Sequence, residues 1–168
     1  GNSVAREPSV YVDYAHTPDA LAKALETVRE TNPASLTVVF GCGGDRDRRK
    51  RPMMGAIAAD RADRVYVTSD NPRTESPDAI MAEIVAGVAG QRRTILTQLA
   101  SRREAIRMAI SAANDDDAVL IAGKGHESYQ EVNGVRQAFS DLEEARAALV
   151  IRHQQSQSFA EQGEHVDR

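Results

Sequence analysis

The chain has 168 residues, of which 41% are apolar and 27% charged, and these values are typical of a single globular domain with a core of its own. A net charge of −4 and an aromatic content of 4% argue against nucleic acid as a partner, and the single cysteine, Cys42, excludes an intrachain disulfide. No apolar run has the length of a membrane span or of a signal-peptide core, so we expect a soluble, cytoplasmic protein with no membrane partner.

Two strands and two helices are predicted in the first part of the chain. The strands are the β-branched runs 9–13 and 36–40. The first helix begins at Pro18, where a missing N–H costs nothing, and its apolar residues recur every three or four positions. The second helix begins at Pro52, after a loop of glycines and basic residues, and continues to about Arg61.

The middle of the chain continues the alternation of strands and helices. A third strand is predicted at 64–69 and is followed by a helix that Ser76 caps. A weaker strand at 94–97 precedes a helix that begins after Ser101, with Glu104 placed as in a capping box. This repeated pattern predicts β-α units and a mostly parallel sheet flanked by helices.

The last part of the chain holds a central strand and a hairpin. Residues 118–122 form a continuous apolar run, suited to a strand buried on both faces. Asn133-Gly134 joins two short strands and favours a tight hairpin turn. A final helix begins at Ser140 or Asp141 and ends near Val150. We therefore expect one domain over residues 1–150 and a polar, disordered tail over 151–168.

Four loops that follow predicted strands are rich in functional groups. In the first, Asp13 and His16 could contact a nucleotide, whereas the equally good alternative is that Asp13 or Thr17 bonds backbone donors at the helix start. The second, 41–47, has glycines that let backbone N–H groups approach an anion. It is not a P-loop, and Arg46 breaks the Gly-x-Gly-x-x-Gly pattern; the basic run 46–51 is more typical of a solvated face.

The third and fourth loops each carry charged side chains. Proline restricts the backbone of the third loop, whereas glycines make the backbone of the fourth loop flexible. In Asp70-Asn71-Pro72-Arg73, Pro72 restricts the loop and Arg73 offers paired donors to a carboxylate; the alternative is a surface Asn-Pro turn. In the fourth loop, Gly123 to Glu127, glycines permit close ligand approach and Glu127 accepts from an ammonium group; the alternative is a glycine-hinged turn. Cys42 is predicted to be a packed thiol.

Taken together, the loops suit a small ligand with several charges. Arg46 and Arg73 offer cations for carboxylates, and Asp70 and Glu127 offer anions for an ammonium group. This combination predicts an amino acid with more than one charged end as the ligand. The hypothesis requires all four loops to lie at the same edge of the sheet.

The four motifs occur in an order that resembles the C-terminal domain of the Mur ligases, over about residues 8 to 150. The motifs are Asp-Tyr-Ala-His-Thr-Pro from Asp13, Gly-Cys-Gly-Gly-Asp-Arg-Asp from Gly41, Asp-Asn-Pro-Arg from Asp70 and Gly-Lys-Gly-His-Glu from Gly123. The resemblance implies a Rossmann-like open, mainly parallel sheet flanked by helices, to which the Asn133-Gly134 turn adds a C-terminal β-hairpin. It also implies a ligase of peptidoglycan synthesis that uses ATP and Mg²⁺ to form an amide through an acyl phosphate.

Within this family, the tetrapeptide is similar to that of the type that joins meso-diaminopimelate to UDP-N-acetylmuramoyl-L-alanyl-D-glutamate. The residues that would hold diaminopimelate are Arg46, Asn71, Arg73, Gly123 and Glu127, with Asp70 and Pro72 shaping the loop. Asp13 and His16 would face ATP. The resemblance assigns no catalytic residue and no metal ligand to this chain.

The chain departs from the family in lacking the uridine-nucleotide domain and the central domain that carries the P-loop and the magnesium ligands. We therefore expect this chain alone to bind ligand weakly and not to catalyse ligation. Two alternatives stand beside this reading: a stand-alone Rossmann-like module that binds small anions or nucleotides, and a relative of folylpolyglutamate synthase. The tetrapeptide disfavours the second alternative.

Overall fold

The computed structural model describes residues 6–89 and 94–166, with side chains described as far as residue 163. In chain order, the elements are β1 (Ser9–Asp13), α1 (Pro18–Arg29), β2 (Leu36–Phe40), α2 (Lys50–Arg61), β3 (Arg64–Val67), α3 (Pro77–Val88), β4 (Ile95–Gln98), α4 (Arg102–Ala112), β5 (Ala118–Ala122), β6 (Tyr129–Val132), β7 (Val135–Ala138) and α5 (Asp141–Val166).

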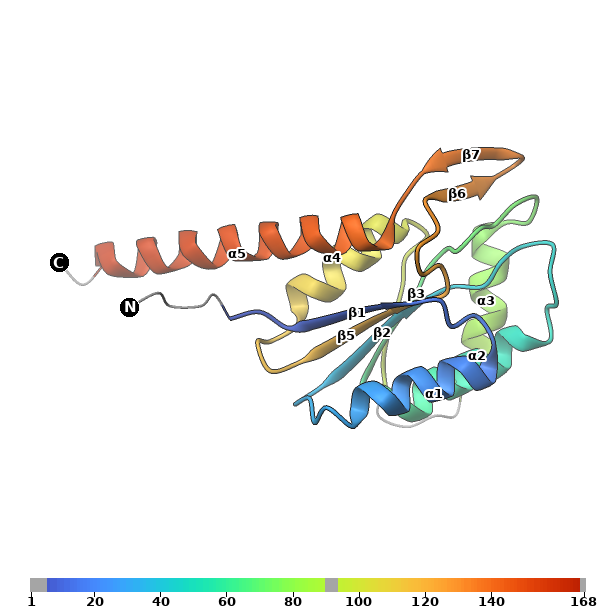
Figure 1. Cartoon of the computed structure of the whole chain (residues 1–168), viewed down its shortest axis with the longest axis horizontal. Coiled ribbons are helices and arrows are strands. Elements are labelled where there is room, and N and C mark those ends of the chain that lie inside the picture. Colours follow the sequence, from blue (N-terminus) through green and yellow to red (C-terminus); the bar gives the residue numbers. More distant parts are fainter. Residues whose placement is uncertain (1–5, 90–93, 167–168) are drawn as a thin grey trace.

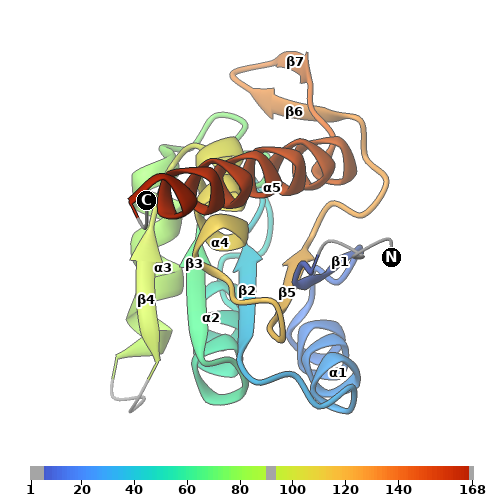
Figure 2. The same ribbon diagram turned by 90° about the vertical axis from the view of Figure 1, so that its left-hand side faces the viewer.

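The first five strands form one sheet in the order β1-β5-β2-β3-β4, and all of its pairs are parallel (Figure 2). β2 and β5 lie inside this sheet and are buried along their whole length, as the continuous apolar run at 118–122 predicted. β6 and β7 form a separate antiparallel pair. Their turn residues, Asn133 and Gly134, both have positive φ angles, which confirms the predicted hairpin.

Helices cover both faces of the sheet (Figure 1). Alternate side chains of β2 and β5 point to opposite faces, because successive residues of a strand alternate. One face packs on apolar residues of α1, α2 and α3, among them Leu25, Met54 and Ile84. The other packs on α4 and α5, through residues such as Ile106 and Ala145. The predicted Rossmann-like α/β fold with a C-terminal hairpin is confirmed.

The predicted helix starts are mostly confirmed by their caps. The side chains of Thr17, Ser76, Ser101 and Ser140 each accept a hydrogen bond from a backbone N–H in the first turn of the helix that follows. The exception is α2, which begins at Lys50 rather than at Pro52. Proline occupies the first turn of a helix without losing a bond, so it does not have to be the first residue.

The predicted end of the last helix near Val150 is wrong. α5 continues to Val166, so residues 151–166 of the expected disordered tail are helical instead, and 167–168 lie outside the described residues. Arg152 supports the continuation, because its Nη2 donates to the carboxylate of Asp115 at 2.7 Å and to the carbonyl of Ala113 at 3.0 Å. Beyond it the side chains described are exposed, and Gln, Ala and Glu extend an established helix at little cost.

Even α5, the longest helix, lacks the apolar stretch that a membrane crossing requires, and so does every other helix in the described part of the chain.

Candidate functional site

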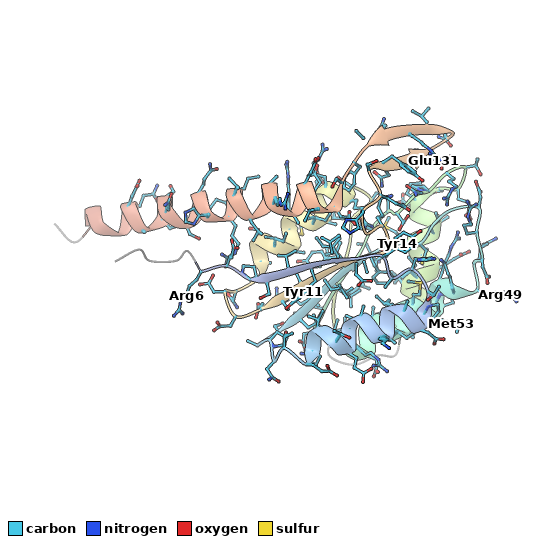
Figure 3. The ribbon with its side chains drawn as sticks, in the orientation of Figure 1. Arg6, Tyr11, Tyr14, Arg49, Met53 and Glu131 are labelled. Atoms are coloured by element: carbon cyan, nitrogen blue, oxygen red, sulfur yellow. The ribbon has the colours of Figure 1, made fainter. Side chains whose placement is uncertain are left out.

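The four predicted loops lie at one edge of the sheet. Parallel strands end on the same side, and the loops follow β1, β2, β3 and β5 there. Figure 3 shows Tyr14 and Arg49, from the first and second loops, toward the end of the molecule that also carries Glu131 of the hairpin. Backbone contacts join the loops: Gly123 N–H donates to the carbonyl of Asp13 at 3.1 Å. The condition set by the sequence hypothesis is met.

The tetrapeptide loop is built around the side chain of Asn71, which is only 2% exposed. Its Oδ1 accepts from Lys124 Nζ and from the backbone N–H of Glu131, each at 2.9 Å. Its carbonyl accepts from the Gly44 N–H at 2.8 Å. Asn71 therefore joins three loops at once, and its side-chain NH₂ group, for which the described part of the chain shows no acceptor, is left to offer to a ligand.

Arg73 is the residue of this loop whose side chain reaches outward. Its backbone is in the left-handed region, with φ of 53°. Its Nη1 donates to the carbonyl of Gly44 at 2.9 Å, and its Nε lies 3.5 Å from Oε2 of Glu131. The guanidinium is partly exposed and held at two points, an arrangement suited to receiving a carboxylate.

Lys124 is a functional residue that the sequence analysis did not select, although it named the loop that holds it. Its side chain has no exposure. Nζ lies 2.9 Å from Oδ1 of Asn71, 3.7 Å from Oε2 of Glu127 and 4.0 Å from Oδ1 of Asp70. Burial lowers the pKa of Lys124, and the nearby carboxylates oppose this shift. One ammonium group therefore organises three predicted ligand residues.

Gly123 must be glycine for two reasons. Its φ of 116° is a conformation that other residues rarely adopt, and a Cβ there would lie 2.7 Å from Oδ2 of Asp70. The fourth loop therefore runs directly against the third. Glu127 follows in this loop, and its Oε2 is buried without a hydrogen-bond partner among the described residues. This oxygen lies 3.7 Å from the Lys124 ammonium, so it retains an unused capacity to accept a hydrogen bond.

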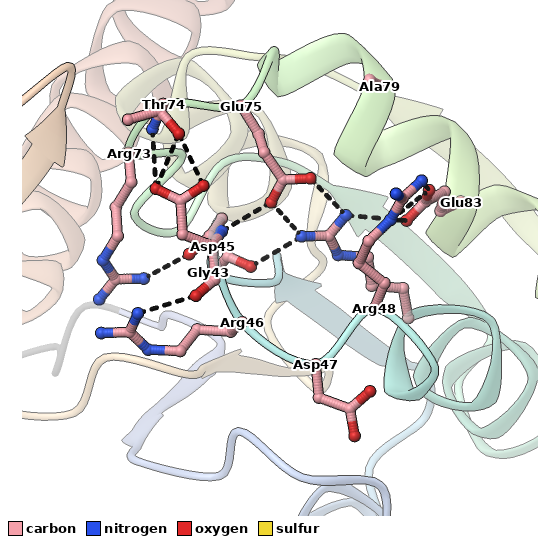
Figure 4. Close-up of polar contacts among 12 residues, drawn as sticks. Gly43, Asp45, Arg46, Asp47, Arg48, Arg73, Thr74, Glu75, Ala79 and Glu83 are labelled. Atoms are coloured by element: carbon pink, nitrogen blue, oxygen red, sulfur yellow. Dashed lines mark hydrogen bonds and ion pairs between the residues drawn. The ribbon is translucent and has the colours of Figure 1, made fainter.

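A network of ion pairs fixes the second loop to the third (Figure 4). Asp45 accepts from the N–H and the hydroxyl of Thr74, and its own N–H donates to Glu75 at 2.7 Å. Arg51, only 1% exposed, donates to Glu75, to Glu83 and to the carbonyl of Gly43. The two loops therefore form one rigid unit.

The interpretation of 46–51 as a solvated face is correct for its first four residues and wrong for Arg51. Arg46 to Arg49 are exposed, whereas the Arg51 guanidinium is buried between the carboxylates of Glu75 and Glu83. The sequence could not distinguish the last arginine of a basic run from its neighbours. Arg46 is exposed, and its Nη1 donates to the carbonyl of Asp45 at 2.9 Å. The side chains of Arg46 and Arg73 both lie next to Gly43.

The first loop makes the contacts expected if Asp13 or Thr17 bonds backbone donors at the start of the helix. Oδ1 of Asp13 accepts from the Ala15 N–H at 2.7 Å, and Thr17 caps α1. His16 is exposed, and its ring lies edge-on to Tyr14 with centroids 4.8 Å apart. Nζ of Lys50 donates to the His16 carbonyl at 2.8 Å. Asp13 and His16 thus lie at the edge of the sheet that carries the four loops, on the side of β1.

Two further groups support the site from inside. The Cys42 thiol is buried, and this burial raises its pKa to about 12, so it stays protonated and is a packed thiol as predicted. Arg102 was not selected from the sequence: it pairs with Asp141 in full burial, and it donates to the carbonyls of Ser69 and Ala122. Those two carbonyls immediately precede the third and fourth loops.

Within residues 6–89 and 94–166, the acidic side chains, histidines and cysteine do not gather into a group of three or more that could hold a metal ion. The described residues therefore do not fit a magnesium site of their own.

Comparison with known proteins defines the class. The family model described as "Mur ligase, glutamate ligase domain" matches residues 2–125, and the chain therefore belongs to this family. The chain is 57% identical over 140 residues to UDP-N-acetylmuramoyl-L-alanyl-D-glutamate--2,6-diaminopimelate ligase of Chlorobaculum tepidum. That match covers 82% of this chain and 27% of the relative, so the chain spans under a third of the relative's length.

Solved structures agree with this assignment. A structure of UDP-N-acetylmuramoyl-L-alanyl-D-glutamate--2,6-diaminopimelate ligase matches with a TM-score of 0.80 and 46% identity, over 90% of this chain and 32% of the other. Bifunctional folylpolyglutamate synthase/dihydrofolate synthase from Yersinia pestis matches with a TM-score of 0.53 and 22% identity, over 71% of this chain and 26% of the other. The second likeness shows the fold alone.

Proposed function

We propose that this chain is the part of an ATP-dependent ligase that holds the incoming meso-diaminopimelate, which the whole enzyme joins to UDP-N-acetylmuramoyl-L-alanyl-D-glutamate in peptidoglycan synthesis. The names of the relatives that are more than half identical support this substrate. We further propose that residues 1–150 form the working unit, and that the missing part of the ligation site comes from segments outside this chain.

The observation that carries the proposal is the placement of opposite charges at one edge of the sheet. Arg73 and Arg46 reach outward from neighbouring loops, and Glu127 and Asp70 lie behind them around the buried Lys124 ammonium. Diaminopimelate carries two carboxylates and two ammonium groups. An arginine binds a carboxylate with paired donors, and a carboxylate accepts from an ammonium group. The edge therefore complements this zwitterion.

The roles follow from these contacts. Arg73, which Gly44 and Glu131 hold in place, binds the carboxylate at the distal end of diaminopimelate, and Arg46 adds a second cation. Asn71 offers its side-chain NH₂ group, Gly123 allows the fourth loop to lie directly against Asp70 beside the ligand, and Pro72 keeps the tetrapeptide loop in shape. Holding one end in this way orients the amine at the other end for attack, which lowers the entropic part of the barrier.

ATP would supply the activation of the acceptor carboxylate as an acyl phosphate. In this chain, we propose that Asp13 and His16 lie beside the nucleotide, because both are exposed at the β1 side of the same edge. The chain shows no metal-binding group of its own among the described residues, and the proposal gives it no part in holding Mg²⁺.

The test is calorimetric titration of the chain with meso-diaminopimelate and with lysine, which lacks the distal carboxylate. We expect diaminopimelate to bind more tightly, and Arg73→Ala to reduce its affinity by about 1.5–3 kcal/mol, the usual value of a charge-assisted hydrogen bond. Arg49→Ala is the matched control, because Arg49 is exposed in the same group of loops and pairs with Asp47. Tighter binding of lysine would contradict the proposal.

A second measurement concerns catalysis by the chain alone. Incubation with ATP, Mg²⁺, diaminopimelate and the UDP-muramoyl dipeptide should release no phosphate and form no amide. Ligation by the purified chain would show that no further segment is required. Binding of nucleotide or small anions without any binding of diaminopimelate would favour the stand-alone module instead.

A further inference from the structure

The β6–β7 hairpin lies outside the five-stranded sheet, above the edge that carries the loops (Figures 1 and 2). All four residues of β7 are exposed. A two-stranded hairpin is marginally stable on its own in water, so its attachment to the rest of the molecule decides its position. That attachment is made by β6 and the turn, and its partner is the tetrapeptide loop.

Four hydrogen bonds join the hairpin to this loop. Nε2 of Gln130 donates to the carbonyl of Asp70 at 2.8 Å, and the Glu131 N–H donates to Oδ1 of Asn71 at 2.9 Å. The Arg73 N–H donates to the Glu131 carbonyl at 3.1 Å, and the Asn133 N–H donates to the Arg73 carbonyl at 2.9 Å. Arg73 therefore has both of its backbone groups bonded to the hairpin, as a short parallel bridge.

This bridge holds Arg73 in a conformation that it would not otherwise keep. Its φ of 53° is uncommon for a residue with a Cβ, and such conformations persist where surrounding contacts determine them. Released from the hairpin, the residue would return to the ordinary β or α region. That change would move its side chain from the position that it has in the structure.

Glu131 also acts on the side chain of Arg73. Its Oε2 lies 3.5 Å from Nε, while Nη1 is bonded to the carbonyl of Gly44. The two side chains are 20% and 23% exposed, so the pair is partly desolvated. Among the described residues, none accepts a hydrogen bond from Nη2. The guanidinium is thus fixed along one side, which leaves its Nη2 group to donate to a carboxylate.

We propose that Glu131 is a positioning residue for Arg73: from the hairpin, it sets both the backbone and the guanidinium of the arginine that receives the substrate carboxylate. The inference rests on the proposed function for the identity of that substrate. A competing role, in which Glu131 occupies Arg73 until substrate displaces it, predicts the opposite effect on affinity, and the experiment separates the two.

The first experiment compares Glu131→Gln with the parent chain. The amide keeps the size and the backbone bonds of Glu131 but removes its charge. Affinity for meso-diaminopimelate should fall about fivefold, the factor expected for a partly exposed ion pair, while affinity for lysine stays unchanged. Gln137→Ala, an exposed change on the same hairpin, and Glu30→Gln, an exposed charge removal at the end of α1, are the controls and should alter neither affinity.

Unchanged or tighter binding of diaminopimelate by Glu131→Gln would overturn the proposal, and tighter binding would identify Glu131 as a competitor. An equal loss of affinity for diaminopimelate and lysine would mean general damage to the loop, and it would also overturn the proposal.

The second experiment needs no ligand and therefore separates this inference from the proposed function. Nuclear magnetic resonance of the Arg73 Nε–H group should show an ordered guanidinium in the parent and in Gln137→Ala, and a mobile one in Glu131→Gln. Equal order in all three proteins would refute the positioning role. A parent chain that fails to bind diaminopimelate would count against the proposed function alone, and the order of Arg73 would still decide the role of Glu131.

Discussion

The variant Asp141→Ala tests whether a buried ion pair stabilises the residues that precede the third and fourth loops. Asp141 accepts from Nε and Nη2 of Arg102, each at 2.7 Å, and neither side chain has any exposure. The same guanidinium donates to the carbonyls of Ser69 at 3.0 Å and Ala122 at 3.1 Å. Alanine at 141 would leave a buried cation with carbonyl partners only.

Removing one partner of a buried ion pair costs about 3–5 kcal/mol, because the remaining charge is uncompensated. Arg102→Met should cost a similar amount, since it leaves the Asp141 carboxylate buried and also strips the two carbonyls of their donor. The double variant has no stranded charge. Its remaining cost is mainly that of two buried carbonyls without a donor, about 1–3 kcal/mol each, so its free energy of unfolding should fall by less than the sum of the two single effects.

The assay is urea unfolding followed by far-ultraviolet circular dichroism, because the chain contains no tryptophan. Glu144→Ala is the matched control: Glu144 pairs with Arg103 at 2.9 Å, and this pair joins the same two helices but is largely exposed on the arginine side. It should cost under about 1 kcal/mol. If Asp141→Ala costs no more than this control, the reasoning is refuted. If it does not fold, Asp141→Asn, which keeps one acceptor, should show an intermediate loss.

Three further predictions concern single residues at or below the loops. Cys42 should resist alkylation by iodoacetamide at mildly alkaline pH in the folded chain, because burial raises its pKa to about 12, and it should react once urea unfolds the chain. Equal alkylation rates in the folded and unfolded states would contradict its burial. Hydrogen bonds from Arg48 and Arg51 lower the pKa of Glu83 from 4.5 to about 2, so the contribution of Glu83 to the free energy of unfolding should be fully present above about pH 4.5 and lost as the pH falls toward 2. Acid titration of the parent and of Glu83→Gln should therefore show a weaker pH dependence in the variant; the same dependence in both would contradict this. Gly123→Ala should cost about 1–3 kcal/mol in urea unfolding, because of its positive φ and the contact with Asp70; a neutral effect would mean that the loop relaxes freely.

Much of the fold was predictable because its signals are local. The five strands, the hairpin turn and four helix caps depend on β-branched runs, on Asn133-Gly134 and on single hydroxyl groups before helices. The end of α5 was not predictable in this way. The polar residues after Val150 bury no apolar face. The sequence alone does not show whether such a segment continues the helix or is non-helical.

The outward-facing part of the candidate site was also accessible from the sequence. Arg73, Arg46 and Glu127 stand in loops that follow strands, where functional groups gather. The inward-facing part was not. Arg51 was interpreted as part of a solvated basic run, and Arg102 was not selected from the sequence, yet both are buried and bonded to carboxylates distant in the chain.

Sequence patterns were sufficient to identify an α/β domain with four charged loops, and the order of the motifs indicated the family. The tertiary structure decided that the loops share one edge, that Lys124 joins three of their polar groups, and that a hairpin holds Arg73 in a left-handed conformation. The reason is physical. Local patterns set which segments become strands and helices, whereas the burial of a charge depends on partners that only folding brings within reach.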